Sequence, residues 1–161
     1  MEATTETRLL ILFIALLSFV GCLSWCVMSW VVRICPLASR RFALANLLIF
    51  TGTTLIYLRP EPPTFGLWFA SNAAILTGFY FVYAGLLKLF KLTWPSRSAA
   101  LTAIIALIAL MLLSQNTDNG WLIGAVFSAA AAILFGHAAW ANYQGIRQEF
   151  TRSSALAVSS P

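Results

Sequence analysis

Five long stretches of the chain contain no Asp, Glu, Lys or Arg, and this limits the possible folds more than any other feature. Each stretch is 17–25 residues long, and together they cover residues 9–32, 42–58, 63–87, 98–114 and 121–141. A helix needs about 20 apolar residues, within a range of about 17–25, to cross a bilayer core of about 30 Å. Strands of membrane barrels alternate polar and apolar residues, and these stretches do not. The sequence therefore predicts an all-α integral membrane protein, a bundle of about five transmembrane helices.

The composition excludes the common soluble classes. Of the 161 residues, 60% are apolar and 9% are charged, against about 45–50% and about 25% in soluble domains. A water-soluble domain could not cover its surface with so few charges, and a disordered chain would contain fewer apolar residues. The three cysteines are too few, and odd in number, for a disulfide framework.

The charged residues of the connecting segments predict the orientation. If the N-terminus is outside, the inner segments carry eight of the ten basic residues, leaving only Arg8 and Arg59 outside, and four of the five acidic residues are also outside. Short cytoplasmic loops are enriched in Lys and Arg, so we expect the N-terminus outside and the C-terminus in the cytoplasm. The net charge of +5 then reflects topology and attraction to anionic lipid rather than nucleic-acid binding.

This topology divides the chain into three parts. Residues 1–8 form an external N-terminus, residues 9–141 a five-helix transmembrane domain, and residues 142–161 a cytoplasmic tail or linker stalk. The spacing of Tyr143, Ile146, Phe150 and Ala157 is compatible with an amphipathic extension of the last helix, while the Ser-rich residues 153–160 are typical of a linker or a frayed end.

Small residues at four-residue spacing predict close helix packing, because helices in lipid associate where small side chains let their backbones approach. One stripe lies on the third predicted helix and another on the fifth. They form either contacts within the chain or the seam of a homodimer. The candidate packing residues are Gly52, Ala70, Ala74, Gly78, Ser128, Ala132 and Gly136.

Polar residues within the spans fall into two layers, as judged from a rise of 1.5 Å per helical residue. The layer near the midplane contains Thr51, Thr54, Asn72 and Thr77. It serves either as hydrogen-bonded contacts between the second and third helices or as a pocket for a small ligand.

The second layer lies about 6 Å from the inner boundary and contains Asn46, Tyr83 and His137. Ionisable residues within a membrane are candidates for function, and His137 is the only histidine of the chain. It is either a neutral structural residue hydrogen-bonded to Asn46 or Tyr83, a group that responds to pH or a ligand, or a ligand of a metal or haem.

The sequence contains no recognisable catalytic constellation, zinc-ligand spacing or phosphate-binding loop. We therefore assign no catalytic residue, metal site or cofactor, and do not expect this chain alone to be an enzyme. Cys22 and Cys26 share a helix face, which is compatible with apolar packing or with a Cu(I) site.

Residues 42–91 contain a degenerate pattern on the second and third predicted helices. It consists of Phe-Ala-Leu-Ala-Asn from Phe42, then Gly52, Leu58-Arg59, a Pro-rich turn, Ala70-Ser71-Asn72-Ala73, Gly78, Tyr83-Ala84-Gly85-Leu86 and Phe90. This pattern resembles the N-terminal membrane modules of bacterial diguanylate cyclases that carry GGDEF domains. Members of that family commonly have two more helices and then the catalytic domain, which these 161 residues do not contain, so no catalytic residue is carried over.

The resemblance implies a non-catalytic module in the bacterial inner membrane that anchors the protein and passes a signal to a cytoplasmic output domain. Its expected partners are the lipid bilayer and either a second copy of the chain or that output domain. Two alternatives from other classes are a small transporter or channel subunit and a structural assembly subunit of a membrane complex.

Overall fold

The computed structural model describes residues 5–59, 64–90, 97–115 and 120–158, with the side chains of the last helix as far as residue 147. Within these residues the chain is all-α, as predicted. The elements are α1 (Thr5–Val27), a π-helical turn η1 (Met28–Val32), α2 (Pro36–Tyr57), α3 (Phe65–Leu89), α4 (Arg97–Leu113) and α5 (Gly120–Val158). The Pro-rich turn at 60–63 and most of the polar turn at 115–120 lie outside the described residues.

Three of the described helices are long and apolar enough to cross a membrane, namely Thr5–Val32, Phe65–Leu89 and Gly120–Arg147. The helix Arg97–Leu113 is apolar but shorter. Helix α2 has 22 residues, yet it includes two arginines near its start and several threonines, which lower its hydropathy. Length and composition therefore make the chain a candidate membrane protein with three candidate spans.

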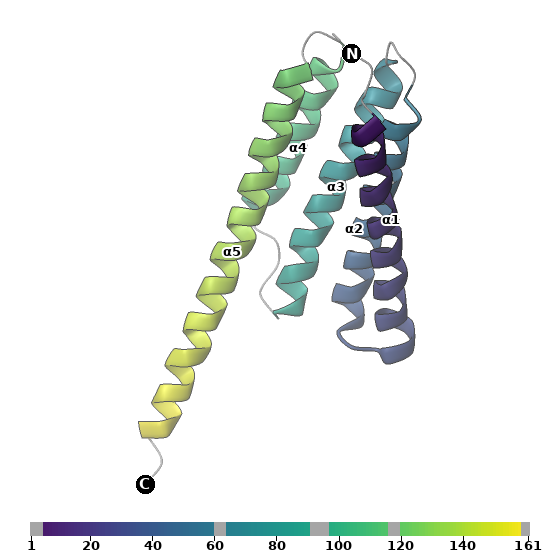
Figure 1. Ribbon diagram of the computed structural model, residues 1–161. Coiled ribbons are helices and arrows are strands. Elements are labelled where there is room, and N and C mark those ends of the chain that lie inside the picture. Colours follow the sequence, from purple (N-terminus) through teal and green to yellow (C-terminus); the bar gives the residue numbers. More distant parts are fainter. Residues whose placement is uncertain (1–4, 60–63, 91–96, 116–119, 159–161) are drawn as a thin grey trace.

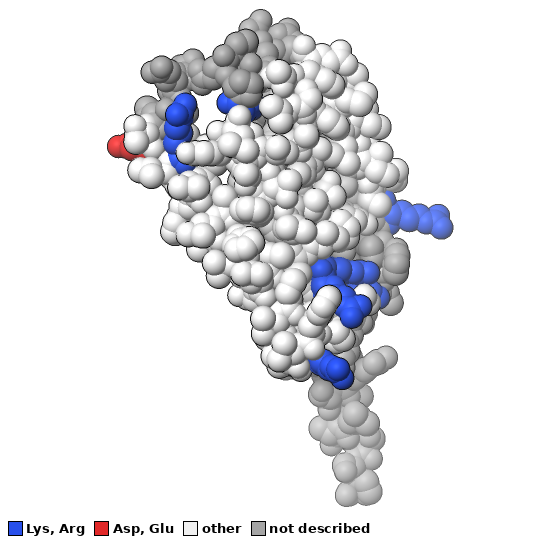
Figure 2. All heavy atoms as spheres, turned by 90° about the vertical axis from the view of Figure 1, so that its right-hand side faces the viewer, with Lys and Arg blue, Asp and Glu red and all other residues white. Residues whose placement is uncertain are grey.

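Charged side chains gather towards the two ends of the molecule on the face formed by α1 and α2 (Figure 2). The surface between these ends is largely free of Lys, Arg, Asp and Glu, and most large apolar side chains of α1 are exposed on it. Glu6, near the start of α1, is the only acidic residue whose side chain is described. Such an apolar band between polar ends is the surface expected of a helix bundle in lipid.

Helix α2 packs between α1 and α3, and α3 in turn contacts α4 and α5 (Figure 1). Rings join α1 to α2, with centroid distances of 5.4 Å for Phe19–Phe50 and 4.6 Å for Trp25–Phe42. A separate core on the other side of α3 is formed by residues of α3, α4 and α5, including Leu76, Tyr83, Leu87, Leu110 and Leu134.

Glycines bring the backbones of α2 and α3 into direct contact. A Cβ atom at Gly52 would lie 2.7 Å from the carbonyl oxygen of Ser71, and one at Gly78 would lie 3.0 Å from the carbonyl oxygen of Ala45. Farther along α3, a Cβ at Gly85 would lie 2.8 Å from the ring of Phe42. At Gly52 and Gly78 an added Cβ would press on the backbone of the other helix, so glycine lets the two backbones come this close.

Two arginines link α2 to α3 at opposite ends of this contact. The guanidinium carbon of Arg59 lies 4.7 Å from the centroid of the Trp68 ring, which is a cation–π contact. At the other end, Nη1 of Arg41 donates a hydrogen bond of 2.8 Å to the carbonyl oxygen of Ala84. The pair is thus fixed along its length and not only at its centre.

Three helix boundaries differ from the sequence prediction by four residues or more, and the first is that α1 begins at Thr5 rather than at residue 9. Helix α2 begins at Pro36, six residues before the predicted span, because proline suits the first helical position and its missing N–H leaves no donor unpaired there. Arg40 and Arg41 therefore lie on a helix rather than in a loop. Helix α5 continues to Val158, so residues 153–158 extend the helix instead of starting a linker.

We predict that Gly52→Ala destabilises the protein by about 1–3 kcal/mol, the usual cost of overpacking a close contact. The added methyl would press on Ser71 and on Ile75, whose Cγ1 atom would be 2.5 Å away. Thermal unfolding in detergent measures this effect. Gly124→Ala is the matched control, because nothing lies within 4 Å of its added Cβ, and it should unfold at or above the wild-type temperature. Equal unfolding temperatures for Gly52→Ala and the wild type would contradict the close contact.

Candidate functional site

Two of the four side chains in the predicted midplane layer bond to their own helices. The hydroxyl of Thr51 donates to the carbonyl oxygen of Leu47 at 2.8 Å, and the amide of Asn72 donates to that of Trp68 at 2.9 Å. Thr51 is exposed, whereas Thr54, Asn72 and Thr77 are half-buried. Within the described part of the chain, no hydrogen bond joins these four residues across α2 and α3. Thr51 and Asn72 thus satisfy their donors within their own helices.

The predicted inner layer is divided between two sides of the bundle. Asn46 donates to the carbonyl oxygen of Phe42 at 2.9 Å, and its side chain lies against Gly21 of α1. Tyr83 is buried in the core that α3 forms with α4 and α5. His137 is half-buried on α5, next to Ala138 of the same core, and receives no hydrogen bond from a described residue. The expected hydrogen bond from Asn46 or Tyr83 to His137 is therefore not found.

The candidate packing residues have two different environments. Gly52 and Gly78 are buried between α2 and α3, while Ala70 is exposed and Ala74 half-buried. On α5, Ser128, Ala132 and Gly136 are all exposed. The buried face of α5 consists instead of Ile123, Ala130, Leu134 and Ala138. The small-residue stripe of α5 is thus not used for packing within the described chain.

The cysteines of the described chain do not belong to a larger cluster of metal-ligating residues. No group of three or more His, Cys, Asp or Glu that could hold an ion is found among the described residues. Cys22 is half-buried, and Cys26 is exposed on the outer surface of α1. The side chain of Cys22 is therefore partly packed within the bundle, whereas that of Cys26 is not.

The turn between α1 and α2 has an unusual backbone. The last residues of α1 widen into the π-helical turn η1, a form that often occurs at functional sites. Arg33 and Cys35 then adopt left-handed conformations with φ of 57° and 42°, which side-chain-bearing residues rarely occupy. A strained backbone of this kind persists only where its surroundings hold it in place.

Two buried serines hold this turn. The hydroxyl of Ser39 donates to the carbonyl oxygen of Ile34 at 2.9 Å, and that of Ser29 donates to the carbonyl oxygen of Pro36 at 3.4 Å. Both serines are 3% exposed or less. Hydrogen bonds from α1 and from α2 thus fix the same short segment from its two sides.

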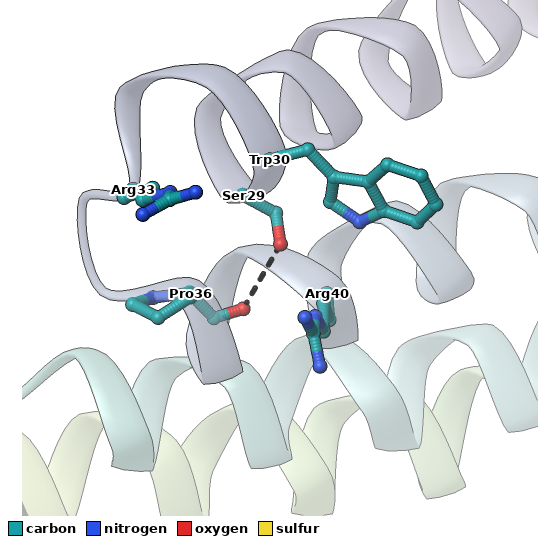
Figure 3. A pocket seen from close by; sticks show the side chains of 5 residues that line it. All are labelled: Ser29, Trp30, Arg33, Pro36 and Arg40. Carbon is teal, nitrogen blue, oxygen red and sulfur yellow. Dashed lines mark hydrogen bonds between the residues drawn. The ribbon is translucent and has the colours of Figure 1, made fainter.

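A cavity of about 380 Å³ opens beside this turn, lined by Ser29, Trp30, Arg33, Pro36 and Arg40. Small-molecule sites typically have volumes of about 300–1,000 Å³. Figure 3 shows Arg33 and Arg40 on opposite sides of the Ser29–Pro36 hydrogen bond, with the indole of Trp30 above Arg40. The cavity therefore combines two guanidinium groups with one aromatic ring, a set suited to an anion.

The sequence pattern does not predict this cavity. In the sequence, Arg33, Arg40 and Arg41 are basic residues of a predicted inner loop. The separate roles of the two adjacent arginines depend on the start of α2, since Arg41 then points to Ala84 of α3 while Arg40 lines the cavity. The proline at position 36 was the available signal for that start.

Comparison of the chain with protein-family models, curated proteins and solved structures found no match.

Replacing Arg41 should destabilise the fold through its bond to α3. A hydrogen bond from a charged donor contributes about 1.5–3 kcal/mol, so we expect Arg41→Met to lower the free energy of unfolding by about that amount. The neighbouring variant Arg40→Met removes the same charge from an exposed side chain and should cost less than about 0.5 kcal/mol. Unfolding in neutral detergent measures both variants. Equal losses would show that the Arg41–Ala84 bond contributes nothing specific.

Proposed function

We propose that this chain is a membrane-embedded module that receives a signal, anchors the protein and transmits the signal through α5. In this proposal all five apolar stretches cross the inner membrane of a bacterium, with the N-terminus outside and the C-terminus in the cytoplasm. The observation that carries the proposal is the length and continuity of α5.

Helix α5 is 39 residues long and runs without interruption from Gly120 to Val158. At 1.5 Å per residue it extends about 58 Å, against about 30 Å for a bilayer core. Figure 1 shows that its C-terminal end reaches beyond the ends of the other helices. A rotation or shift of the bundle would therefore be carried directly along this helix to whatever follows it.

The exposed stripe of α5 supports pairing of two copies. Ser128, Ala132 and Gly136 are spaced at four residues, and a Cβ at Gly136 would meet nothing within 4 Å. Small side chains at this spacing allow two transmembrane helices to approach closely. Two α5 helices in contact would form a paired stalk, which suits an output domain that works as a dimer.

The resemblance of residues 42–91 to the membrane modules of diguanylate cyclases supports the same role. Glycines that belong to that pattern, Gly52, Gly78 and Gly85, are the residues at which α2 and α3 touch. The pattern therefore coincides with a closely packed helix pair. A module that transmits movement needs such packing, because loosely packed helices would absorb the movement.

A transporter or channel subunit is less well supported. Transport needs a polar path through the bundle, whereas the polar side chains of Thr51, Thr53 and Asn72 bond to carbonyl groups of their own helices. Assembly as a purely structural subunit would use the same α5 surface, but it would not need a stalk of fixed helical phase.

The phase of the stalk tests the proposal. We would fuse a reporter enzyme that is active only as a dimer after Pro161 and insert residues after Arg147. Two residues rotate the following helix by about 200°, whereas seven rotate it by about 700°, close to two full turns. We expect the two-residue insertion to change reporter activity several-fold and the seven-residue insertion to leave it near that of the parent fusion.

Two results would contradict this account. Equal activity with both insertions would show that helical phase is not transmitted. A parent fusion that is silent and monomeric would show that the chain does not pair through α5.

A further inference from the structure

The cavity beside the α1–α2 turn contains positive charge that the described chain does not neutralise. Neither Arg33 nor Arg40 makes an ion pair or hydrogen bond with a described residue, and both side chains are exposed. The one described carboxylate, that of Glu6, is near the other end of α1. Two guanidinium groups that line one cavity therefore favour an anion between them.

The donors available in the cavity fit a phosphate group. Guanidinium groups bind phosphate oxygens through paired N–H donors. The Ser29 hydroxyl is already used, because it donates to the carbonyl oxygen of Pro36. The indole N–H of Trp30 makes no hydrogen bond with a described residue, and Figure 3 shows its nitrogen on the side of the ring nearer Arg40. Arg33, Arg40 and Trp30 can thus supply donors from three sides.

Hydrogen bonds link the two backbone segments that carry these donors. Arg33 follows a π-helical turn and has a left-handed backbone, while Arg40 lies in the second turn of α2. The bonds of Ser29 and Ser39 tie these two segments together. Because the backbones that carry Arg33 and Arg40 are held together, a ligand needs to order only the two side chains.

The surroundings of the cavity distinguish a lipid from a water-soluble anion. The side chain of Trp30 is 74% exposed and that of Val31 75%, and Val32, Ile34 and Leu37 are also exposed. These residues continue the exposed apolar surface of α1, where Val27 and Leu23 precede them. A ligand with an anionic head and an apolar tail could therefore fill the cavity and cover this surface at the same time.

We propose that this cavity binds the phosphate of an anionic phospholipid headgroup. Arg33 and Arg40 hold the phosphate oxygens, the Trp30 N–H donates to the headgroup, and the acyl chains lie along the exposed side of η1 and α1. Basic pockets at the cytoplasmic side of transmembrane helices are suited to such headgroups. The inference goes beyond the signalling role and does not depend on it.

Lipid binding to the purified full chain in neutral detergent tests the proposal. Native mass spectrometry would count bound phosphatidylglycerol and phosphatidylcholine over a titration. We expect the wild type to bind phosphatidylglycerol at least about tenfold more tightly, with each of Arg33→Gln and Arg40→Gln about fivefold weaker, given the usual contribution of one basic residue near anionic lipid. The double variant should lose the preference.

Arg97→Gln is the matched control. It removes an exposed arginine from the first residue of α4, outside the cavity, and should bind phosphatidylglycerol within about twofold of the wild type. The double variant Arg33→Lys with Arg40→Lys keeps the charge but loses the planar donor pairs, so we expect intermediate binding. Unfolding temperatures in lipid-free detergent identify any variant that fails to fold.

Three outcomes would overturn the proposal. If the wild type binds the two lipids equally, the proposal is wrong, and this measurement needs no variant. Wild-type affinity in a folded Arg33→Gln, Arg40→Gln protein would place the lipid elsewhere. Millimolar inorganic phosphate that stabilises the wild type but not this double variant, without preference for phosphatidylglycerol, would assign the cavity to a soluble phosphate.

Discussion

The direct contact between the backbones of α2 and α3 is the interaction on which the rest of the arrangement depends. In the proposed membrane setting, burial of apolar surface gives helices no net drive to associate, so close packing must hold them together. Gly52, Gly78 and Gly85 permit that packing by leaving out side chains that would collide with the neighbouring helix. Arg41 can reach Ala84 because the helices lie this close, and α2 in turn carries α1 on its other side.

The sequence predicted the limits of α3 and α4 along the chain better than the direction in which side chains face around each helix. Charges end the apolar stretches, and each residue adds a fixed rise, so α3 and α4 begin and end within two residues of the predicted limits. The direction in which a side chain faces depends on which helix lies beside its own helix. The positions of the charges do not show which helices are neighbours. Asn46 therefore faces α1 while Tyr83 lies in the other core, and Ser128 and Gly136 are exposed.

The proposed signalling role and the proposed lipid site use different parts of the same bundle. The contact of α2 with α3 leaves the turn before α2 at one end, where Arg33 and Arg40 line a cavity. It leaves α5 on the far side of α3, with one face packed and the other free. A headgroup held at the turn would fix the depth of α1 and α2 in the membrane. Movement of α5 relative to that fixed pair is then a means of transmitting a signal.

Labelling of single cysteines in intact cells tests the central claim, a bundle with its basic turns in the cytoplasm, most directly. Cys35 occurs naturally in the α1–α2 turn and is exposed, and Gln115→Cys, with Cys22, Cys26 and Cys35 replaced, would probe the end of α4. A maleimide that does not cross membranes should label position 115 in intact cells and Cys35 only after permeabilisation. Labelling of Cys35 in intact cells, with position 115 protected, would contradict the proposed orientation.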